Sequence, residues 1–352
     1  MDIYILDQTF RTVALIDTFG SFLWIDRYNG FGDFEIYTFV DADVIRDAQQ
    51  DYYVWSSQSE HLMMIDERII NSDVESGNTL TIRGRSLEWL LNRRIIWAQT
   101  NLTGNFQNGI QKLLNENVIN PSIAARRIDN FIFQPSTDPR ITSMTIDKQF
   151  TGTNLYEAIR DLCTERELGF KIVLNNNNQF VFSLYMGSDR SYSQIVNPHV
   201  VFSPGFDNII NSNYFETNRV IKNVALIAGE GEGAARRTTT VGGVSGLARR
   251  ELFVDARDIS SDTQDGILTN SQYIALLASR GDERLAEYQF VQTFEGDVEA
   301  TQMFVYKTDF FIGDVVQIVN EFGLEASVRI IEIVFSNNNS GNNVVPTFKV
   351  IP

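Results

Sequence analysis

Seven short apolar runs separated by turn residues lie between Met1 and Ile96, and this spacing limits the possible fold more than any other feature of the sequence. The runs are IYILD, TVALID, FLWIDRY, FGDFEIYTF, YYVWS, HLMMIDERII and NTLTIRG. Strand-like runs at such close intervals predict a β-barrel or a β-sandwich. Apolar and polar residues alternate around Phe34 and Ile36, which predicts a strand with one buried face and one face toward water or a partner.

Turn and helix signals follow these runs. The ESGN stretch at 75–78 predicts a hairpin turn in which Gly77 takes a positive φ. The 86–91 segment, SLEWLL, predicts one or two helical turns. Apolar residues at helical spacing predict a helix over 105–116, so a new region of mixed structure begins near this point.

A second helix is predicted over 155–168, with Thr153 or Asn154 as its N-cap and Gly169 as its stop. The strands GFKIVL and QFVFSLY come next, joined by the asparagines 175–178. Asparagine tolerates left-handed backbone conformations, so this segment is predicted to be a hairpin.

The C-terminal part returns to strand character. NIINSNYFETN and KNVALIAG predict two strands, and the Gly, Ala, Arg and Thr-rich segment 229–246 after them predicts a long exposed loop or arm. A helix is predicted over 270–289, weakened by the internal Gly281. TQMFVY, GDVVQIVN, ASVRIIEIVF and VPTFKVI then predict a second all-β unit. The fold class is therefore a β-rich α+β, multidomain protein with strand-rich ends and an intervening α/β region.

Charge and cysteine content exclude several classes of function. The 352 residues carry a formal net charge of −16 with a sequence pI near 4.6, which disfavours tight binding of nucleic acid. Cys163 is the single cysteine, so no intramolecular disulfide is expected, and a buried structural role is favoured over a nucleophile. The N-terminus lacks the pattern of a signal peptide, and no apolar run is long enough for a membrane helix.

No motif indicates a cofactor, a metal or a catalytic residue. The G-E-G-E-G run at 229–233 lacks the helix that a phosphate-binding loop needs, and two glutamates would face the phosphate. His61 and His199 are far apart and lack the spacing of zinc ligands. The RRELFVDARD segment could suggest paired-carboxylate chemistry, but ion pairing is the favoured interpretation.

Arginines and acids near these glycines are predicted to contact neighbouring subunits, since arginine is enriched at protein interfaces. The arginine pairs could instead offset the glutamates of the same loop. The candidate inter-subunit contacts are Arg236, Arg237, Arg249, Arg250, Glu251, Asp255, Arg257 and Asp258.

Three stretches, taken in order, resemble the tail hub proteins of long-tailed bacteriophages, relatives of the contractile-tail baseplate hub. The first is SFLWIDRYNGFGDFEIYTF followed by MMIDERIINSDVESGNTLTIRGRSLEWLLNRRII. The second is ALIAGEGEGAARRTTTV with GLARRELFVDARD, and the third is GDVVQIVNEFGLEASVRIIEIVFS with PTFKVI. The resemblance spans most of the chain.

This resemblance implies a homotrimer in which each chain supplies two tube-like β-barrels. The first barrel would occupy 1–98 and the second 206–352, the latter with a Gly/Arg-rich loop at 229–250 and a helical insertion at about 269–290. The α/β middle domain would occupy 99–205. Three chains would then present six similar barrels to the sixfold tail tube.

The same resemblance implies partners and a location. The trimer would bind the distal tail protein ring, the C-terminus of the tape-measure protein and a central fibre or spike, at the tail tip of a virion assembled in the host cytoplasm. Genomic DNA would pass through without specific binding, because three chains carry 3 × −16, or −48, charges. Longer relatives carry fibre or wall-degrading domains after the second barrel, whereas this sequence stops at Pro352.

Two other functions stay open from the sequence. One is a carbohydrate-binding or glycan-cleaving tail-tip protein, with the middle region as binding module and Asp255 or Asp258 as the acid. The other is a tube or sheath subunit, which would form sixfold rings. A structural, non-enzymatic hub is the favoured prediction.

Overall fold

The computed structural model describes residues 2–73, 77–208, 212–263, 266–288, 291–296, 303–323, 325–338 and 341–351. The chain divides into two compact units, and each is built from segments that are far apart in the sequence. Unit 1 comprises Met1–Trp89, Gly169–Phe215 and Gln292–Pro352, and unit 2 comprises Leu90–Leu168 and Glu216–Val291. The division into segments 1–98, 99–205 and 206–352 stays a prediction.

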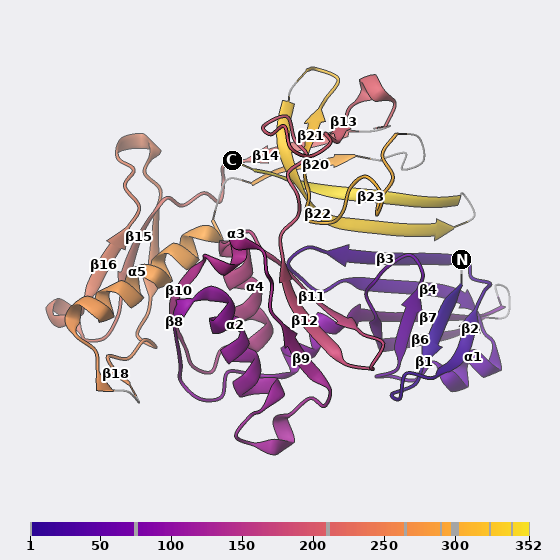
Figure 1. Cartoon of the computed structure of the whole chain (residues 1–352), viewed down its shortest axis with the longest axis horizontal. Coiled ribbons are helices and arrows are strands. Elements are labelled where there is room, and N and C mark those ends of the chain that lie inside the picture. The colour runs from indigo at the N-terminus through magenta and orange to yellow at the C-terminus, as the bar shows by residue number, and fades with distance from the viewer. Residues whose placement is uncertain are drawn as a thin grey trace. The chain divides into compact units, whose positions relative to one another are not determined.

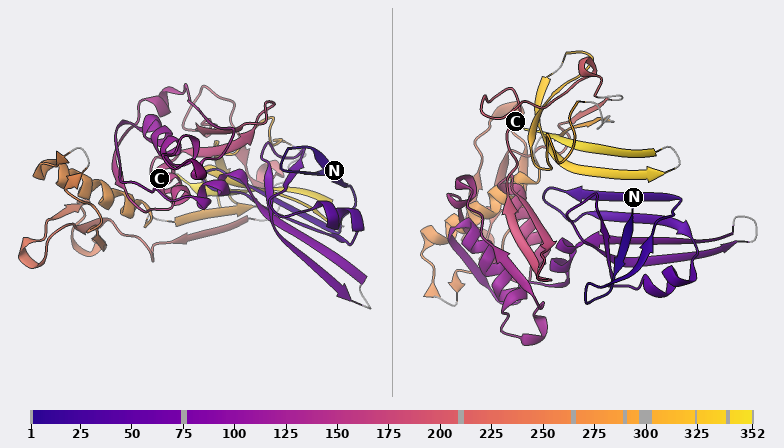
Figure 2. Two further views of the ribbon diagram at one scale, coloured as in Figure 1. Left: turned by 90° about the horizontal axis from the view of Figure 1, so that it is seen from below. Right: turned by 45° about the vertical axis from the view of Figure 1, so that its right-hand side comes forward.

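Unit 1 begins with the seven strands that the sequence predicts. They are β1 (Ile3–Leu6), β2 (Thr12–Ile16), β3 (Ser21–Arg27), β4 (Asp33–Phe39), β5 (Tyr53–Ser56), β6 (Met63–Asp73) and β7 (Gly77–Ser86), with helix α1 (Ala42–Asp47) between β4 and β5 and the 3-10 helix η1 (Leu87–Arg93) after β7. Phe34 and Ile36 are buried in β4, as the alternation predicts. Residues 75 and 76 of the predicted hairpin turn lie outside the described residues, while Gly77 has φ +80°. Figure 2 shows the β6–β7 hairpin extending away from the other N-terminal strands.

Later segments complete unit 1. Their elements are β11 (Gly169–Leu174), β12 (Phe180–Tyr185), β13 (Val201–Phe202), η4 (Pro204–Phe206), β14 (Ser212–Thr217), β20 (Val291–Gly296), β21 (Val315–Val319), β22 (Glu325–Asn338) and β23 (Gly341–Val350). β11 and β12 form the predicted antiparallel hairpin, and Asn178 in its loop has φ +56°. Asparagine adopts the left-handed conformation more readily than most other residues, which explains why asparagines occupy this loop.

One sheet connects the two strand-rich ends of the chain. Its strand order is β14-β20-β23-β22-β3-β4-β7-β6-β5-β1-β2, and β13 and β21 join it through β22. β22 pairs antiparallel with β3, and Phe335 lies opposite Trp24, as Figure 1 shows for the two strands side by side. No sheet closes into a barrel among the strands that the structure describes. The β-rich α+β fold class is therefore confirmed, whereas two separate barrels stay a prediction.

The core of unit 1 combines residues from both ends of the sequence. Phe22, Trp24 and Phe34 come from the N-terminal strands, and Phe202 and Phe348 pack into the same cluster. Aromatic rings from alternate positions of paired strands bury large apolar areas, each contributing about 1.5–3 kcal/mol. This shared core makes the N-terminal and C-terminal strands one cooperative body.

Unit 2 contains the helices that the sequence predicts. Its elements are β8 (Thr100–Asn105), α2 (Phe106–Leu114), η2 (Asn115–Ile119), η3 (Ala124–Arg126), β9 (Phe131–Gln134), α3 (Pro139–Thr142), β10 (Thr145–Phe150), α4 (Leu155–Glu165), β15 (Val224–Ala228), η5 (Gly233–Ala235), β16 (Thr238–Val241), η6 (Gly246–Ala248), β17 (Glu251–Asp255), β18 (Asp262–Thr263), β19 (Gly266–Ile267) and α5 (Asn270–Ala286). Asn154 caps α4 by accepting from the backbone N–H groups of Tyr156 and Glu157.

The Gly/Arg-rich segment differs from the predicted loop. Thr238–Val241 forms β16, which pairs antiparallel with β15 so that Thr240 lies opposite Leu226. Helix α5 packs on the sheet of β16, β15 and β17, where its Gly281 contacts Ile227 and Val241. Threonine and valine favour strands, and the packing of α5 stabilises this hairpin. In the described part of the chain no helix has the length and hydropathy needed to cross a bilayer.

Candidate functional site

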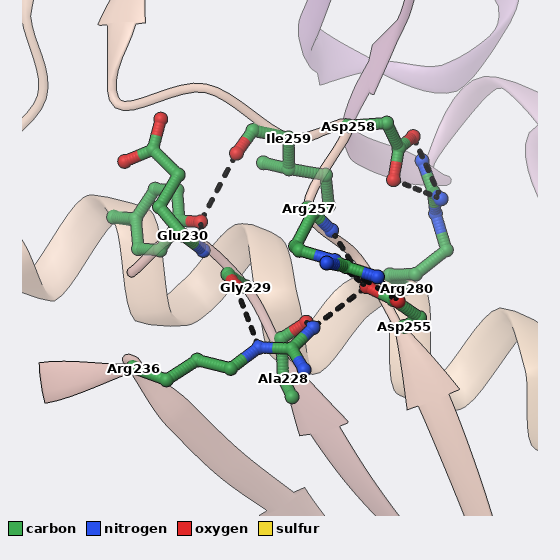
Figure 3. A network of polar contacts seen from close by, with 10 residues as sticks. Ala228, Gly229, Glu230, Arg236, Asp255, Arg257, Asp258, Ile259 and Arg280 are labelled. Atoms are coloured by element: carbon green, nitrogen blue, oxygen red, sulfur yellow. Dashed lines mark hydrogen bonds and ion pairs between the residues drawn. The ribbon is translucent and has the colours of Figure 1, made fainter. Parts of the chain in front are cut away.

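Strands β15, β16 and β17 bring several of the predicted contact residues together at one end of their sheet. β15 runs parallel to β17, with Ala228 opposite Asp255, and antiparallel to β16, with Ala228 opposite Thr238. The residues after β15, the residues before β16 and the last residue of β17 therefore meet, as Figure 3 shows. The polar network at this end is the candidate functional site.

Arg236 and Asp255 form the centre of the network. The Arg236 guanidinium donates to the carbonyls of Gly229 at 3.0 Å and Ala228 at 2.8 Å, and to Asp255 Oδ1 at 2.6 Å. Asp255 also accepts from the backbone N–H and the guanidinium of Arg257, with Nη2 to Oδ2 at 2.6 Å. Hydrogen bonds from Arg257, together with the positive charges of both arginines, lower the pKa of Asp255 to about 2.

Arg237 and Glu230 form a second pair beside the first. The Arg237 guanidinium lies 3.8 Å from the Tyr273 ring centroid and donates to Glu230 and to Ser261 Oγ. Glu230 accepts from the backbone N–H of Ser261 at 2.9 Å and from its hydroxyl at 2.7 Å. Burial raises the pKa of Glu230, but the hydrogen bonds from Ser261 outweigh burial, so the pKa is lowered.

The Tyr273 hydroxyl fixes the backbone around this pair. It accepts from the N–H of Glu230 at 2.8 Å and donates to the carbonyl of Ile259 at 3.0 Å. Gly229 lies directly against this ring, where an added Cβ would meet the hydroxyl at 2.3 Å. Gly229 is thus packed on α5, and Glu230 is held against Arg237. This arrangement presents a carboxylate, so the glycine run is unsuited to binding phosphate.

Of the remaining predicted contacts, Asp258 lies beside the network and the other three lie elsewhere on unit 2. Arg249 pairs with Glu251 at 2.5 Å at the opposite end of β17, and the Arg250 side chain donates to the carbonyl of Asn218. Asp258 pairs with Arg280 of α5 at 3.1 Å. The structure thus brings Arg236, Asp255 and Arg257 into one cluster, places Arg237 and Asp258 beside it, and separates Arg249, Arg250 and Glu251 from it.

All eight residues have partners within their own chain. The sequence left such pairing open as an alternative to contacts between subunits. Their side chains differ in exposure: Arg236 is 21% exposed, whereas Glu251 and Arg257 are 67% and 66% exposed. Exposed ion pairs contribute little to stability, about 0–1 kcal/mol each. Their role between subunits stays a prediction, with Glu251 and Arg257 the most accessible members.

A buried network in unit 1 was not predicted. His61 lies after β5, Glu88 lies in the first turn of η1, and His61 Nδ1 is 3.4 Å from Glu88 Oε1. Glu88 also accepts from the N–H of Ile172 at 2.6 Å and from the Ser86 hydroxyl. Burial alone would lower the pKa of His61, but the negative charges of Asp26 and Glu88 outweigh it and raise the pKa to about 9.

Asp26 completes this network on β3. Its carboxylate accepts from Trp24 Nε1 at 2.9 Å and from Ser59 Oγ at 2.7 Å. Asp26 occupies the inward-facing position two residues after Trp24, and a charged residue on that buried face was the one sequence signal that could have indicated the network. His61 is protonated at neutral pH, so it serves as a buried cation and not as a base.

This network borders a pocket of about 520 Å³ within unit 1. Its lining consists of Asp26, Glu60, His61, Lys171, Tyr185, Met186, Gly187, Ser188, Tyr306, Lys307, Phe311, Ile312 and Asp314. The lysines are held by protein groups, since Lys171 pairs with Glu60 at 2.6 Å and Lys307 donates to the carbonyl of Gln58. The pocket is strongly charged, and its charges are largely compensated by one another.

Unit 2 contains its own buried ion pairs. Lys148 of β10 lies 3.0 Å from Glu165 of α4 and 3.6 Å from Glu283 of α5, and it donates to the carbonyl of Ser279 at 2.9 Å. This cation joins a strand and two helices. Across the described residues, no cluster of three or more His, Cys, Asp or Glu side chains is arranged to hold a metal ion.

Comparison with known proteins identifies the family. The family model of the Siphovirus ReqiPepy6 Gp37-like protein matches residues 2–348. The chain belongs to this family. No curated protein matches the sequence.

Solved tail proteins share the fold of this family member over nearly its whole length. The prophage MuSo2 43 kDa tail protein from Shewanella oneidensis has a TM-score of 0.61 at 13% identity, covering 99% of this chain and 98% of that one. The tail protein from Neisseria meningitidis MC58 has a TM-score of 0.58 at 13% identity, with coverage of 99% and 95%. The prophage tail protein gp18 from Listeria monocytogenes EGD-e has a TM-score of 0.57 at 12% identity, with coverage of 99% and 94%.

The resemblance to phage tail-tip proteins is therefore confirmed, and this member of the siphovirus family has the fold of solved phage tail proteins. Its site geometry also bears on the glycan-cleaving alternative. A general acid in glycoside hydrolysis needs a raised pKa, whereas the pKa of Asp255 is lowered to about 2. Asp255 is therefore unsuited to that role, and Asp258 is paired with Arg280 at 3.1 Å.

Proposed function

We propose that this siphovirus protein is the hub of a tail tip, a non-enzymatic homotrimer that joins the sixfold tail tube to the threefold end of the tail. The family match over residues 2–348 is the observation that carries the proposal. The common fold with three prophage tail proteins over almost their full length supports it. The mechanism is geometric, because assembly and not bond chemistry performs the function.

The large sheet of unit 1 supports the symmetry-matching role. β3 and β22 place the N-terminal group β1–β7 beside the C-terminal group β20–β23 in one continuous sheet. A trimer would then present six strand groups, two from each chain, to a sixfold tube. In the assembled particle each group would take the tube-like form, with neighbouring chains covering the open edges of the sheet.

The charge supports a conduit that DNA passes without being bound. Three chains carry 3 × −16, or −48, charges, and an anionic wall repels phosphate. The distal tail protein ring, the C-terminus of the tape-measure protein and a central fibre or spike are the proposed partners. The trimer would close the tube before adsorption and open it afterwards.

Mass measurement of the purified chain tests the proposal. Three chains of 40.0 kDa give 120 kDa, and light scattering should report this value at micromolar concentration. Negative-stain images with the distal tail partner should show threefold rings stacked on sixfold rings. Hexamers would instead indicate a tube or sheath subunit, and a monomer at all concentrations would contradict the hub.

A further inference from the structure

Residues 90–128 of unit 2 form a basic segment within an acidic protein. The segment contains one acid, Glu116, so its net charge is +4 in a chain whose total is −16. Its basic residues are Arg93, Arg94, Lys112, Arg126 and Arg127. A negatively charged partner is repelled by the chain as a whole, and this segment is where it meets attraction.

Arg94 and Arg126 lie together in this segment without a carboxylate partner. The Arg94 guanidinium donates to the carbonyls of Arg126 at 2.8 Å and Arg93 at 3.0 Å. The Arg126 guanidinium donates to the carbonyl of Ile95 at 2.5 Å and to Asn117 Oδ1 at 3.1 Å. Among the described residues neither side chain forms an ion pair with an acid. Arginine carries five N–H donors, so both guanidiniums keep donors for an acceptor from outside the chain.

The two cations act on each other. Burial and the positive charge of Arg94 lower the pKa of Arg126, and no carboxylate opposes these effects. Arg127, the next residue along the chain, differs because it pairs with Asp129 at 3.3 Å. A carboxylate from a partner would relieve the repulsion between Arg94 and Arg126 and accept charge-assisted hydrogen bonds from both.

Apolar side chains flank the two arginines. Ile95 and Trp97 are 42% and 60% exposed, whereas Ile96 between them is buried, as the alternation of an extended segment requires. The Arg126 guanidinium lies 5.3 Å from the centroid of the Trp97 ring. Arginine and tryptophan are enriched among the residues that carry most of the binding energy at protein interfaces. A partner can therefore place an apolar side chain on Trp97 while its acid reaches the arginines.

Asn117 holds this surface in place before any partner binds. Its side chain is buried, and its Oδ1 accepts from the backbone N–H of Trp97 at 3.4 Å as well as from Arg126. Its Nδ2 donates to the carbonyl of Leu113 at 2.9 Å. Asn117 lies in η2, a π-helical turn that continues α2, and such turns frequently occur at functional sites. A surface fixed in this way loses little conformational entropy on binding.

The surroundings of the two arginines favour a protein carboxylate over a nucleic acid phosphate. Nucleic acid binding needs many Lys and Arg side chains that neutralise successive phosphates, whereas Arg127 is already paired with Asp129. Single-stranded nucleic acid also stacks its bases on open aromatic faces, and the Trp97 ring already has Arg126 over it. The exposed Ile95 offers apolar contact to a side chain.

We propose that Arg94, Arg126 and Trp97 bind an acidic segment of another protein. One carboxylate of that segment accepts from both guanidiniums, and a neighbouring apolar side chain packs against Trp97. The contact needs one copy of this chain, so it goes beyond the proposed trimer and does not depend on it. It gives unit 2 a partner-binding role, whereas the strand groups of the symmetry-matching proposal lie in unit 1.

A labelled peptide of alternating glutamate and leucine tests this Arg94–Arg126–Trp97 patch. Fluorescence anisotropy with the full chain measures the Kd of the peptide. Arg94→Gln and Arg126→Gln should each raise that Kd about tenfold, because each variant loses charge-assisted hydrogen bonds to the carboxylate. A peptide with glutamine in place of glutamate should bind the wild type at least about tenfold more weakly than the glutamate peptide.

Arg127→Gln is the matched control for these variants. It removes the same charge from the neighbouring residue, whose guanidinium is exposed and paired with Asp129, so the Kd should change less than about twofold. Trp97→Ala tests the apolar half of the patch and should raise the Kd about tenfold, while the backbone N–H that Asn117 accepts from is kept. Should Arg126→Gln fail to fold, Arg94→Gln and Trp97→Ala decide the result. An unchanged Kd in both would overturn the proposal, as would a wild type that does not bind the peptide.

Other occupants of the patch are distinguished by two further measurements. An oligonucleotide of equal charge that binds more tightly than the peptide would assign the patch to phosphate and overturn the proposal. Loss of the oligomer in Arg94→Gln, measured by light scattering, would assign the patch to a second copy of the chain and also overturn it. A chain that binds the peptide yet is monomeric at all concentrations would support the patch and contradict the hub, so the two proposals fail separately.

Discussion

Single residues in this protein carry buried charges that hold distant segments together. His61 shows this at the level of one side chain, because its ring lies 3.4 Å from Glu88, the negative charge of Asp26 also acts on it, and all three residues are buried. A buried ion pair is weak evidence of stability by itself, yet removing one partner leaves an uncompensated charge in the interior. The protonation of His61 therefore links stability to pH.

His61→Gln should lower the free energy of unfolding by about 3 kcal/mol at pH 6. The folded pKa of about 9 exceeds the ordinary value of 6.5, so the stabilisation is fully present below pH 6.5 and is lost as the pH rises through 9. Urea denaturation at pH 6, 7.5 and 9.5 should show the difference between variant and wild type shrinking with pH.

His199→Gln is the matched control for this experiment. His199 is exposed and its ring contacts only the carbonyl of Gln194 among the hydrogen bonds described, so its replacement should change stability by less than about 0.5 kcal/mol at each pH. A His61→Gln deficit that stays constant from pH 6 to pH 9.5 would show that His61 is not protonated in the folded chain.

At the scale of elements, helix α5 is adapted to the sheet beneath it. The sequence suggests that Gly281 weakens this helix, since glycine costs about 1 kcal/mol relative to alanine in a helix interior. The structure shows why glycine is needed: an added Cβ would lie 2.4 Å from Ile227 Cδ1 and 2.7 Å from Val241 Cγ2. Close contact between helix and sheet outweighs helix propensity here.

Gly281→Ala should therefore destabilise the protein by about 1–2 kcal/mol, because overpacking outweighs the gain in helix propensity. Thermal or urea denaturation measures the change. Ala275→Gly, the reverse substitution at an exposed position of the same helix, is the control and should also destabilise, by about 0.5–1 kcal/mol. If propensity alone mattered, the two substitutions would have opposite signs.

At the scale of the whole molecule, net charge and apolar contacts act in opposite directions on assembly. Each chain carries −16, so three chains repel one another over distances that salt screens. Ion pairs between subunits, formed by residues such as Glu251 and Arg257, would instead weaken as salt rises.

The trimer should therefore become more stable as ionic strength rises. The Debye length is about 21 Å in 20 mM sodium chloride and about 4 Å in 500 mM. Sedimentation should therefore show a larger 120 kDa fraction at the higher salt concentration. Dissociation at high salt would instead support the arginine and aspartate contacts between subunits.

Much of the local structure follows from the sequence. The seven N-terminal strands, helices α2 and α4 and the asparagine hairpin are all formed as predicted. Each of these signals lies within the element that it predicts: alternation within a strand, a cap such as Asn154, or a turn residue such as Asn178. The bond between Arg257 and Asp255 is equally local, since the two are neighbours in RRELFVDARD.

Tertiary structure decided which of these elements meet. Arg236 reaches Asp255 only because β15 and β17 pair in parallel, and His61 meets Glu88 only because η1 follows β7 past the end of β5. The pairing of β3 with β22 joins strands some 300 residues apart, and this pairing places the two strand-rich ends of the chain in one sheet. Alternation fixes the face that a strand buries, but many strands satisfy the same pattern. The partner is selected by packing in a shared core, which no single segment encodes.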